Sequence, residues 1–525
     1  MRVLIGHAYF QYFDPKLEEA MRPYPPLGTL VAAGLAREAG HDVQVFDAML
    51  ERSTARWDEA IAERPDVAVL FEDNFNYLSK MCLSRMREAA FDMLATARDA
   101  QVPAIVCGSD ASDHCSEFLD AGATAVIRGE GDEALIEALA ALDAAALAAG
   151  GDTASSSAAT LAGIAGLTVR GEDGELVNGP DRKNLKALDD LPFPARDLVD
   201  LDRYRDIHRE HHGRFSLNVV TTRGCPYHCN WCSKPIWGQR YNARSPEDVV
   251  AEIVELRRDH GVEHIWFADD IFGLKPGWIE RFAELVEEHD VQLPFKCLSR
   301  PDLLVRRDTA ELLGDAGAEE VWIGAESGSQ RVLDAMEKGT TVAQIIEAAD
   351  RVHAAGYRIA FFVQFGYPGE TLDDIDATLA LLWRARPDDI GISVAYPLPG
   401  TPFYDRVKAQ LGADTHWVDS SDLAMLFDGP FPTEFYRALH ERVHTEFRMR
   451  QLLWKLRPRS GGAPSLPRPR ELARFVRDAL RLVPQIRRVR RLAEPVADAV
   501  DGLPIDLDRD AAATPSAQPV EITPS

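Results

Sequence analysis

The sequence has little of three things: long apolar runs, positive charge and cysteine. It contains no run of about 18 apolar residues, so no membrane span is expected. The first residues, MRVLIGHAYF, lack the apolar stretch and cleavage site of a signal peptide, which makes the cytoplasm the default location. The formal net charge of −26 argues against a nucleic-acid partner, because wrapping nucleic acid requires a basic footprint.

The cysteines are few and unevenly placed. Seven in 525 residues, an odd number without a signal peptide, do not form a disulfide framework. Three of the seven lie within eight residues, at positions 225, 229 and 232, and this clustering has to be explained. Cys82, Cys107 and Cys115 are expected to be small buried hydrophobes rather than ligands.

Residues 1–145 alternate short apolar strands with helices. This alternation predicts an α/β domain with a doubly wound, Rossmann-like parallel sheet, in which ligands sit at the carboxyl ends of the strands. The expected strands are Arg2–Gly6, Asp42–Asp47, Val67–Phe71, Ala104–Cys107 and Ala125–Arg128, and the expected helices are Pro26–Ala39, Leu83–Asp99 and Asp132–Leu142.

Residues 146–210 predict a linker with a small hairpin. The linker begins in an Ala/Gly/Ser-rich stretch. The hairpin is expected near residues 167–177, followed by an irregular connection that includes Asp200–Tyr204. Further on, residues 426–505 read as helices, and residues 506–525 have the composition of a disordered tail.

In residues 211–425 the alternation of strands and helices returns. Six strand–helix units in about 215 residues predict an open or partial (β/α)6 barrel of the TIM type, whose active site lies at the strand C-termini. The expected strands are Ser216–Val220, His264–Phe267, Pro294–Leu298, Glu320–Gly324, Arg358–Gln364 and Ile390–Ala395.

The clustered cysteines follow the first of these strands in the stretch TRGCPYHCNWCS. Cys225, Cys229 and Cys232 have the spacing C-x3-C-x2-C, and thiolates suit iron–sulfur clusters and zinc. A structural zinc site usually needs four ligands, and no second cysteine pair is present. A Cys3His zinc site that uses His228, or His211 or His212 upstream, stays open by count. A cubane held by three cysteines leaves one iron open to a small chelating molecule, which indicates chemistry rather than electron storage alone.

The stretch CPYHCNWC resembles the CxxxCxΦC signature of the radical S-adenosylmethionine (SAM) superfamily, with Trp231 as the aromatic residue. The resemblance implies a [4Fe-4S] cluster on the three cysteines, which are then the metal-binding and catalytic residues. SAM chelates the open iron, and reductive cleavage yields a 5′-deoxyadenosyl radical. The enzyme then needs an external low-potential electron donor.

Other segments match the superfamily in the expected order along the barrel. Asp269 and Asp270 follow the second strand, where the family contacts the SAM amino group, although helix capping at the strand end is an equal alternative. Arg300 is expected near the SAM carboxylate, or else is a surface arginine. The remaining cofactor-binding candidates are Tyr227 and Trp231 in the cysteine loop, Glu326 and Ser327 after the fourth strand, and Gly366 and Pro368 in the loop GYPGET.

The N-terminal domain is similar to the cobalamin-binding domains that precede some radical SAM barrels. The stretches YPPLGTLVAAGLAREAGHDVQVFDA and AVIRGEGDEAL carry this likeness, and Gly108, Gly129 and Gly131 allow close backbone approach to a cofactor. The DxHxxG motif that supplies an axial histidine is absent, since Asp206 and His208 lie outside the domain and lack the glycine. A degenerate domain used for substrate binding or assembly is the alternative.

Two further stretches stand out. Glu72, Asp73, Asn74 and Asn76 follow the third strand of the first domain and line either a ligand crevice or a polar loop. The stretch RLVPQIRRVRR, residues 481–491, is basic in an acidic chain. It predicts an anion-binding patch, a subunit contact or a solvated basic helix.

The resemblance implies a cobalamin-dependent radical SAM methyltransferase that transfers a methyl group to an unactivated centre of a small-molecule biosynthetic substrate. One SAM supplies the methyl group to cobalamin and a second supplies the radical. The cofactors carry the difficult chemistry and the protein binds, orients and excludes water. A cobalamin-associated radical SAM cyclase or rearrangement enzyme is the alternative, and a non-catalytic cobalamin-binding regulatory protein is a distant one.

Overall fold

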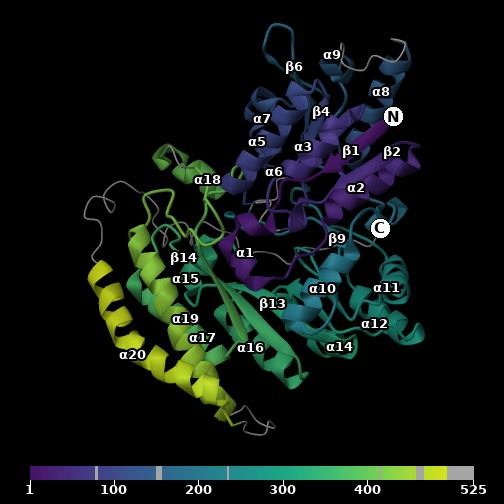
Figure 1. The fold of residues 1–525 in the computed structure, drawn as a ribbon. Helices are drawn as coiled ribbons and strands as arrows, with labels where there is room; N and C mark the ends of the chain where they lie inside the picture. The colour runs from purple at the N-terminus through teal and green to yellow at the C-terminus, as the bar shows by residue number, and fades with distance from the viewer. Residues whose placement is uncertain (77–80, 149–156, 233–235, 413–414, 457–465, 494–525) are drawn as a thin grey trace. The chain divides into compact units, whose positions relative to one another are not determined.

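The computed structural model describes residues 1–76, 81–148, 157–232, 236–412, 415–456 and 466–493 (Figure 1). These residues form two units. One unit comprises Met1–Pro226, Ser233–Leu298 and His416–Asp422, and the other comprises Tyr227–Cys232, Ser299–Thr415 and Leu423–Ser525. The predicted tail at 506–525 lies outside the described residues, as do residues 149–156 of the predicted Ala/Gly/Ser-rich linker stretch. The residues that flank this gap are helical, Asp132–Ala148 before it and Ser157–Leu161 after it.

The first unit begins with a parallel sheet of the predicted kind. Its strands run in the order β2-β1-β3-β4-β5, so the order reverses between β1 and β3. In doubly wound sheets such a reversal opens a crevice at the carboxyl ends of the strands. The strands are β1 (Arg2–Gly6), β2 (Asp42–Phe46), β3 (Val67–Phe71), β4 (Ala104–Cys107) and β5 (Ala125–Ile127).

Three longer helices of this region lie where the sequence predicts them. They are α2 (Leu27–Glu38), α5 (Ser84–Asp99) and α8 (Asp132–Ala148). Apolar side chains from α2, α8 and the strands form one buried core, since both faces of a parallel sheet must be covered. The sequence analysis did not anticipate the shorter elements η1 (Gln11–Phe13), α1 (Pro15–Ala20), η2 (Ala48–Leu50), α3 (Ala55–Ala62), α6 (Ser109–Asp113), α7 (Cys115–Ala121) and α9 (Ser157–Leu161).

The hairpin and the connection after it differ in part from expectation. Strands β6 (Leu167–Arg170) and β7 (Leu176–Asn178) pair as predicted, but β6 also pairs antiparallel with β5 and so extends the first sheet. The expectation that Asp200–Tyr204 is irregular is wrong, because these residues begin helix α10 (Leu201–His212). The Asp200 side chain accepts a hydrogen bond from the Arg203 backbone N–H and caps this helix.

The barrel region begins within the first unit. Strands β8 (Ser216–Val219), β11 (His264–Phe267) and β12 (Phe295–Ser299) are parallel, with β11 paired to both neighbours. Helices α11 (Pro246–His260) and α12 (Trp278–Glu288) connect them. Short strands β9 (Thr222–Arg223) and β10 (Asn242–Ala243) pair antiparallel around the start of the cysteine loop.

The second unit contains the three remaining parallel strands, β13 (Ala318–Glu326), β14 (Arg358–Phe365) and β15 (Asp389–Val394). Two helices precede β13, and two more lie between β13 and β14. The helices are α13 (Pro301–Leu304), α14 (Thr309–Asp315), α15 (Gln330–Ala335), α16 (Val342–Ala354), α17 (Leu372–Ala385) and α18 (Pro402–Val407), followed by η5 (Lys408–Gln410). The predicted succession of an α/β sheet domain, six barrel strands and a helical C-terminal region is confirmed.

The helical region consists of two long helices of the second unit, α19 (Thr433–Leu456) and α20 (Pro469–Leu492), which lie side by side (Figure 1). Asp478 of α20 pairs with Arg448 of α19 at 3.0 Å, and Glu471 pairs with Lys455 at 2.6 Å. Across the described ranges, none of the helices combines the length and the apolar character that a membrane crossing requires.

Candidate active site

The approach to Cys225 is fixed by backbone geometry in the first unit. Gly224 has φ +83°, in the left-handed region that favours glycine. A Cβ atom on this residue would lie 2.2 Å from the Arg240 carbonyl oxygen. Glycine is therefore required immediately before Cys225.

Arg223, two residues before Cys225, is buried in an ion-pair network with the N-terminal sheet domain. Its guanidinium donates to Asp132 at 2.7 and 3.2 Å and also pairs with Glu130. Both carboxylates belong to the stretch RGEGD that follows β5, and Glu130 also accepts the Leu185 backbone N–H at 2.6 Å. The start of the cysteine loop is thus tied to the N-terminal domain by three buried charges, a role that the sequence analysis missed.

Asp269, a predicted SAM contact, is fully occupied within the protein. Its carboxylate accepts hydrogen bonds from the Thr221 backbone N–H, the Thr221 hydroxyl and the Thr222 backbone N–H at 2.7–2.8 Å. Burial raises the pKa of Asp269 to about 6, against the lowering effect of these bonds. Asp269 therefore binds the backbone just beyond β8 and not the N-terminus of a helix, so it does not cap a helix, whereas Asp270 is exposed.

In the second unit, Tyr227–Cys232 is held by Asn230. The Asn230 side chain donates to the Ala335 carbonyl at 2.8 Å and accepts from the Tyr367 hydroxyl at 3.0 Å. The backbone carbonyl of Asn230 accepts the Phe403 N–H at 3.0 Å. Tyr367 lies in the predicted loop GYPGET, so that loop is hydrogen-bonded to the cysteine segment through Asn230.

Arg300, the residue expected near the SAM carboxylate, lies against the cysteine segment. Its guanidinium is 3.5 Å from the centre of the Tyr227 ring, and its Nη1 is 3.9 Å from Cys229 Sγ. The same side chain donates to Asp302 and to the Lys338 carbonyl, both at 2.8 Å. The bland alternative, a surface arginine, is wrong because only 4% of Arg300 is exposed.

Glu326 forms a buried ion pair with Lys338, 2.7 Å between Oε1 and Nζ. Burial alone would lower the pKa of Lys338. The negative charges of Glu326 and Cys229 outweigh burial and raise this pKa above its usual value, so the ammonium stays charged. A side chain at Gly324 would collide with both partners, at 2.3 and 2.4 Å. Lys338 therefore adds a second cation near Cys229, which no inference from the sequence anticipated.

The other candidates in this unit have mixed surroundings. The Ser327 hydroxyl is engaged with Thr378 and with the Ser329 backbone N–H, both at 3.1 Å. Gly366 adopts φ +79° and donates its N–H to Glu370 at 2.7 Å, and Pro368 is buried. Trp231 lies with its ring centre 5.7 Å from Lys338 Nζ.

Glu370 gives a pH prediction. Burial raises its pKa from 4.5 to about 8, with Asp374 raising it further and Arg331 lowering it, and Tyr436 is close enough to feel its charge. Because folded Glu370 keeps its proton up to about pH 8 while the unfolded chain releases it near 4.5, stability falls as pH rises across that window. Glu370→Gln retains an acceptor for Gly366 and is expected to melt at higher temperature than wild type above pH 8. The same difference in melting temperature between variant and wild type at pH 5 and at pH 9 would contradict this.

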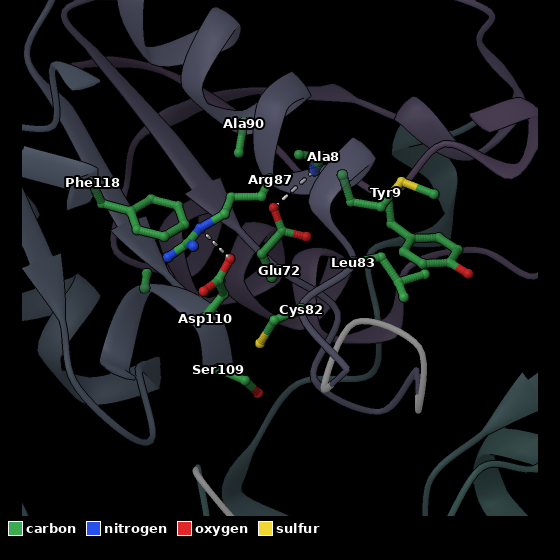
Figure 2. A pocket seen from close by; sticks show the side chains of 12 residues that line it. Ala8, Tyr9, Glu72, Cys82, Leu83, Arg87, Ala90, Ser109, Asp110 and Phe118 are labelled. Atoms are coloured by element: carbon green, nitrogen blue, oxygen red, sulfur yellow. Dashed lines mark hydrogen bonds and ion pairs between the residues drawn. The ribbon is translucent and has the colours of Figure 1, made fainter. Parts of the chain in front are cut away.

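The N-terminal domain carries a pocket at the predicted edge of its sheet (Figure 2). Ala8 and Tyr9 follow β1, Glu72 follows β3, and Ser109 and Asp110 follow β4. Glu72 accepts the Ala8 N–H at 2.9 Å, and Asp110 pairs with Arg87 at 3.1 Å. Burial raises the pKa of Glu72 to about 6. The pocket lies where the order of strands reverses, which is where doubly wound sheets bind ligands.

The three predicted glycines of this domain have different roles. A Cβ at Gly131 would lie 2.4 Å from Cys107 Sγ, so this glycine allows α8 to pack against the sheet. A Cβ at Gly108 would meet the Glu72 side chain at 2.9 Å, beside the pocket. Gly129 has φ +73°, which explains glycine there by conformation alone.

Residues 219–382 match the family model described as the Radical SAM superfamily. The chain contains a radical SAM domain. An "uncharacterized methyltransferase" of Pyrococcus horikoshii is 26% identical over 384 residues, 73% of this chain and 78% of the relative. A hopanoid C-3 methylase of Methylococcus capsulatus is 24% identical over 426 residues, 79% of this chain and 75% of that one.

Two solved structures share the fold of this radical SAM protein over most of its length. The radical SAM methyltransferase TsrM from Kitasatospora setae, with cobalamin and a [4Fe-4S] cluster bound, has a TM-score of 0.60 at 21% identity, covering 78% of this chain and 75% of TsrM. The cobalamin-dependent SAM radical enzyme OxsB has a TM-score of 0.65 at 17% identity, covering 92% and 71%.

The residues around the cysteine segment fit the cluster that the superfamily implies. Three cysteine thiolates bring negative charge, and two buried cations, Arg300 and Lys338, lie in the surroundings of Cys229. Cys229 itself is buried, which suits a site that excludes water. Zinc would need a fourth ligand, and among the loop's histidines His228 is exposed.

Proposed function

We propose that this radical SAM enzyme is a cobalamin-dependent methyltransferase acting on an unactivated centre of a small-molecule biosynthetic substrate. The observation that carries the proposal is the pocket at the carboxyl ends of β1, β3 and β4, in the same chain as the cysteine motif. The relatives named as methylases and the fold shared with TsrM and OxsB support it.

In this proposal each domain has a distinct task. Cys225, Cys229 and Cys232 hold a [4Fe-4S] cluster. The cluster supplies the electron that cleaves SAM, and cobalamin supplies the carrier of the methyl group. Arg300 and Lys338 keep positive charge beside Cys229, and Tyr227 covers the guanidinium of Arg300. Asn230 and Tyr367 fix the backbone between the second and third cysteines.

The pocket of the N-terminal domain is proposed to take part of the cobalamin. Small side chains are among those that line it, including Ala8, Ala90 and Ser109 (Figure 2). A residue of larger volume at position 109 would fill the space without altering the ends of the strands. The DxHxxG motif is absent from the sequence, and His208 of α10 donates from Nε2 to the Pro23 carbonyl at 2.7 Å.

Retention of hydroxocobalamin tests the proposal. Purified protein is expected to keep about one equivalent through gel filtration, with Ser109→Ala behaving like wild type and Ser109→Phe losing the cofactor because the phenyl ring fills the pocket. Absorbance of the protein peak measures the bound corrinoid. If wild type loses the hydroxocobalamin, or if Ser109→Phe retains as much of it as wild type, the assignment of cobalamin to this pocket is wrong.

A cyclase is the second candidate function. An anaerobic magnesium-protoporphyrin IX monomethyl ester cyclase of Cereibacter sphaeroides is 28% identical over 294 residues, which are 54% of this chain and 45% of that protein. The products distinguish the two. Methyl transfer forms S-adenosylhomocysteine together with 5′-deoxyadenosine, whereas ring closure forms 5′-deoxyadenosine alone.

A further inference from the structure

Helix α20 has an exposed apolar stripe. Leu472, Val476, Leu480 and Val483 recur at intervals of four, four and three residues and are between 51% and 75% exposed. This spacing places them on one face of a helix. Leu453 and Leu456 at the end of α19 are also exposed, so six of the thirteen large hydrophobic side chains exposed in the described chain belong to this helix pair.

The same helix is strongly basic. All of its arginines are exposed, and they are Arg470, Arg474, Arg477, Arg481, Arg487, Arg488, Arg490 and Arg491. Its only acidic residues, Glu471 and Asp478, face α19 and pair there with Lys455 and Arg448. The outward face therefore combines apolar and positive side chains and contains no carboxylate, although the chain as a whole has a net charge of −26.

We propose that α20 binds the surface of a membrane rich in anionic lipid, lying in the plane of the headgroups. A helix of 24 residues is about 36 Å long. Amphipathic helices of this length with leucine and valine on one side and arginine on the other bind in this way, with the apolar face at the acyl boundary and the arginines at the phosphates. Because only the outer face is available and α19 covers the inner one, the helix lies on the bilayer and does not cross it.

Two other occupants fit the face less well. A second copy of the chain, docked by two-fold symmetry, would bring the outward arginines of one α20 against those of the other, since such an interface pairs a patch with itself. Nucleic acid would use the arginines but leave four exposed apolar side chains without a role. An anionic bilayer satisfies both sets of side chains at once.

Vesicle flotation of the full-length apoprotein tests the proposal. Wild type is expected to float with phosphatidylcholine vesicles containing phosphatidylglycerol and to stay behind with pure phosphatidylcholine. Val476→Gln with Leu480→Gln should lower the partition coefficient more than tenfold, and each of Arg477→Gln and Arg481→Gln should lower it about fivefold. Leu147→Gln, at a residue 78% exposed at the end of α8, is the control and should float like wild type.

Several outcomes would overturn the proposal. Failure of wild type to float, equal binding to neutral vesicles, or equal loss in the Leu147→Gln control would each do so. A wild-type dimer in light scattering that Val476→Gln with Leu480→Gln converts to a monomer, without vesicle binding, would assign the face to self-association. The apoprotein needs neither cluster nor cobalamin here, so this result and that of the proposed methyl transfer are independent.

Discussion

Replacing Cys225, Cys229 or Cys232 by alanine is expected to abolish reductive cleavage of SAM to 5′-deoxyadenosine. The four irons of the proposed cluster have four ligands, which are the three loop cysteines and SAM. The loop has no fourth cysteine to replace a missing one, so each substitution leaves one iron without its ligand. Anaerobic reconstitution of wild type should give about four irons per chain. The variants should hold little iron, and the measurements are iron content and product formation with a chemical reductant.

Cys297→Ala is the matched control for this experiment. Cys297 of β12 is fully buried, and it belongs to no cysteine cluster in the sequence. Its replacement should leave iron content and SAM cleavage near wild-type values. Retained cleavage in all three loop variants would refute the site, and one zinc per chain in place of iron would favour the Cys3His alternative.

Arg223→Gln is expected to be the most damaging substitution outside the cysteines. It leaves Glu130 and Asp132 buried beside each other without a cation, and removal of one partner from a buried ion pair costs about 3–5 kcal/mol. The thermal midpoint of the apoprotein should fall by roughly 5–15 °C. Iron loading should fall as well, because the network fixes the chain two residues before Cys225.

A combined variant separates stability from positioning. Arg223→Leu with Glu130→Gln and Asp132→Asn removes all three charges and should recover most of the midpoint, since buried ion networks can be replaced by uncharged groups at little cost. If the network positions the loop, iron loading stays low in this variant. Arg182→Gln is the control, because Arg182 pairs with Glu133 and Glu137, whose side chains are half exposed, and should cost under about 1 kcal/mol.

Much of the fold could be predicted because it depends on local pattern. Buried parallel strands are continuous apolar runs, and β1, β3, β4 and β11 begin and end where the sequence places them. Pairing between distant segments could not be read in the same way. The hairpin strand β6 joins the first sheet through β5, about 40 residues earlier, and no local pattern specifies that partner.

The candidate site shows the same division. The segment of Arg300 follows a barrel strand, which predicts a place for this residue at the site. Its approach to Cys229 joins positions 71 residues apart and could not be predicted from local pattern. Asp269 could not be assigned from sequence, since a carboxylate at a strand end serves a ligand or the backbone equally well, and here it binds Thr221 and Thr222. The Arg223 network was missed because its partners lie about 90 residues away in the other domain.

Electron paramagnetic resonance of the reduced, reconstituted enzyme tests the central claim most directly. Three thiolates holding a cubane with one open iron predict a [4Fe-4S]+ signal that changes when SAM is added, because SAM becomes a ligand of that iron. Absence of a cubane signal, or a signal that SAM leaves unaltered, would contradict the account.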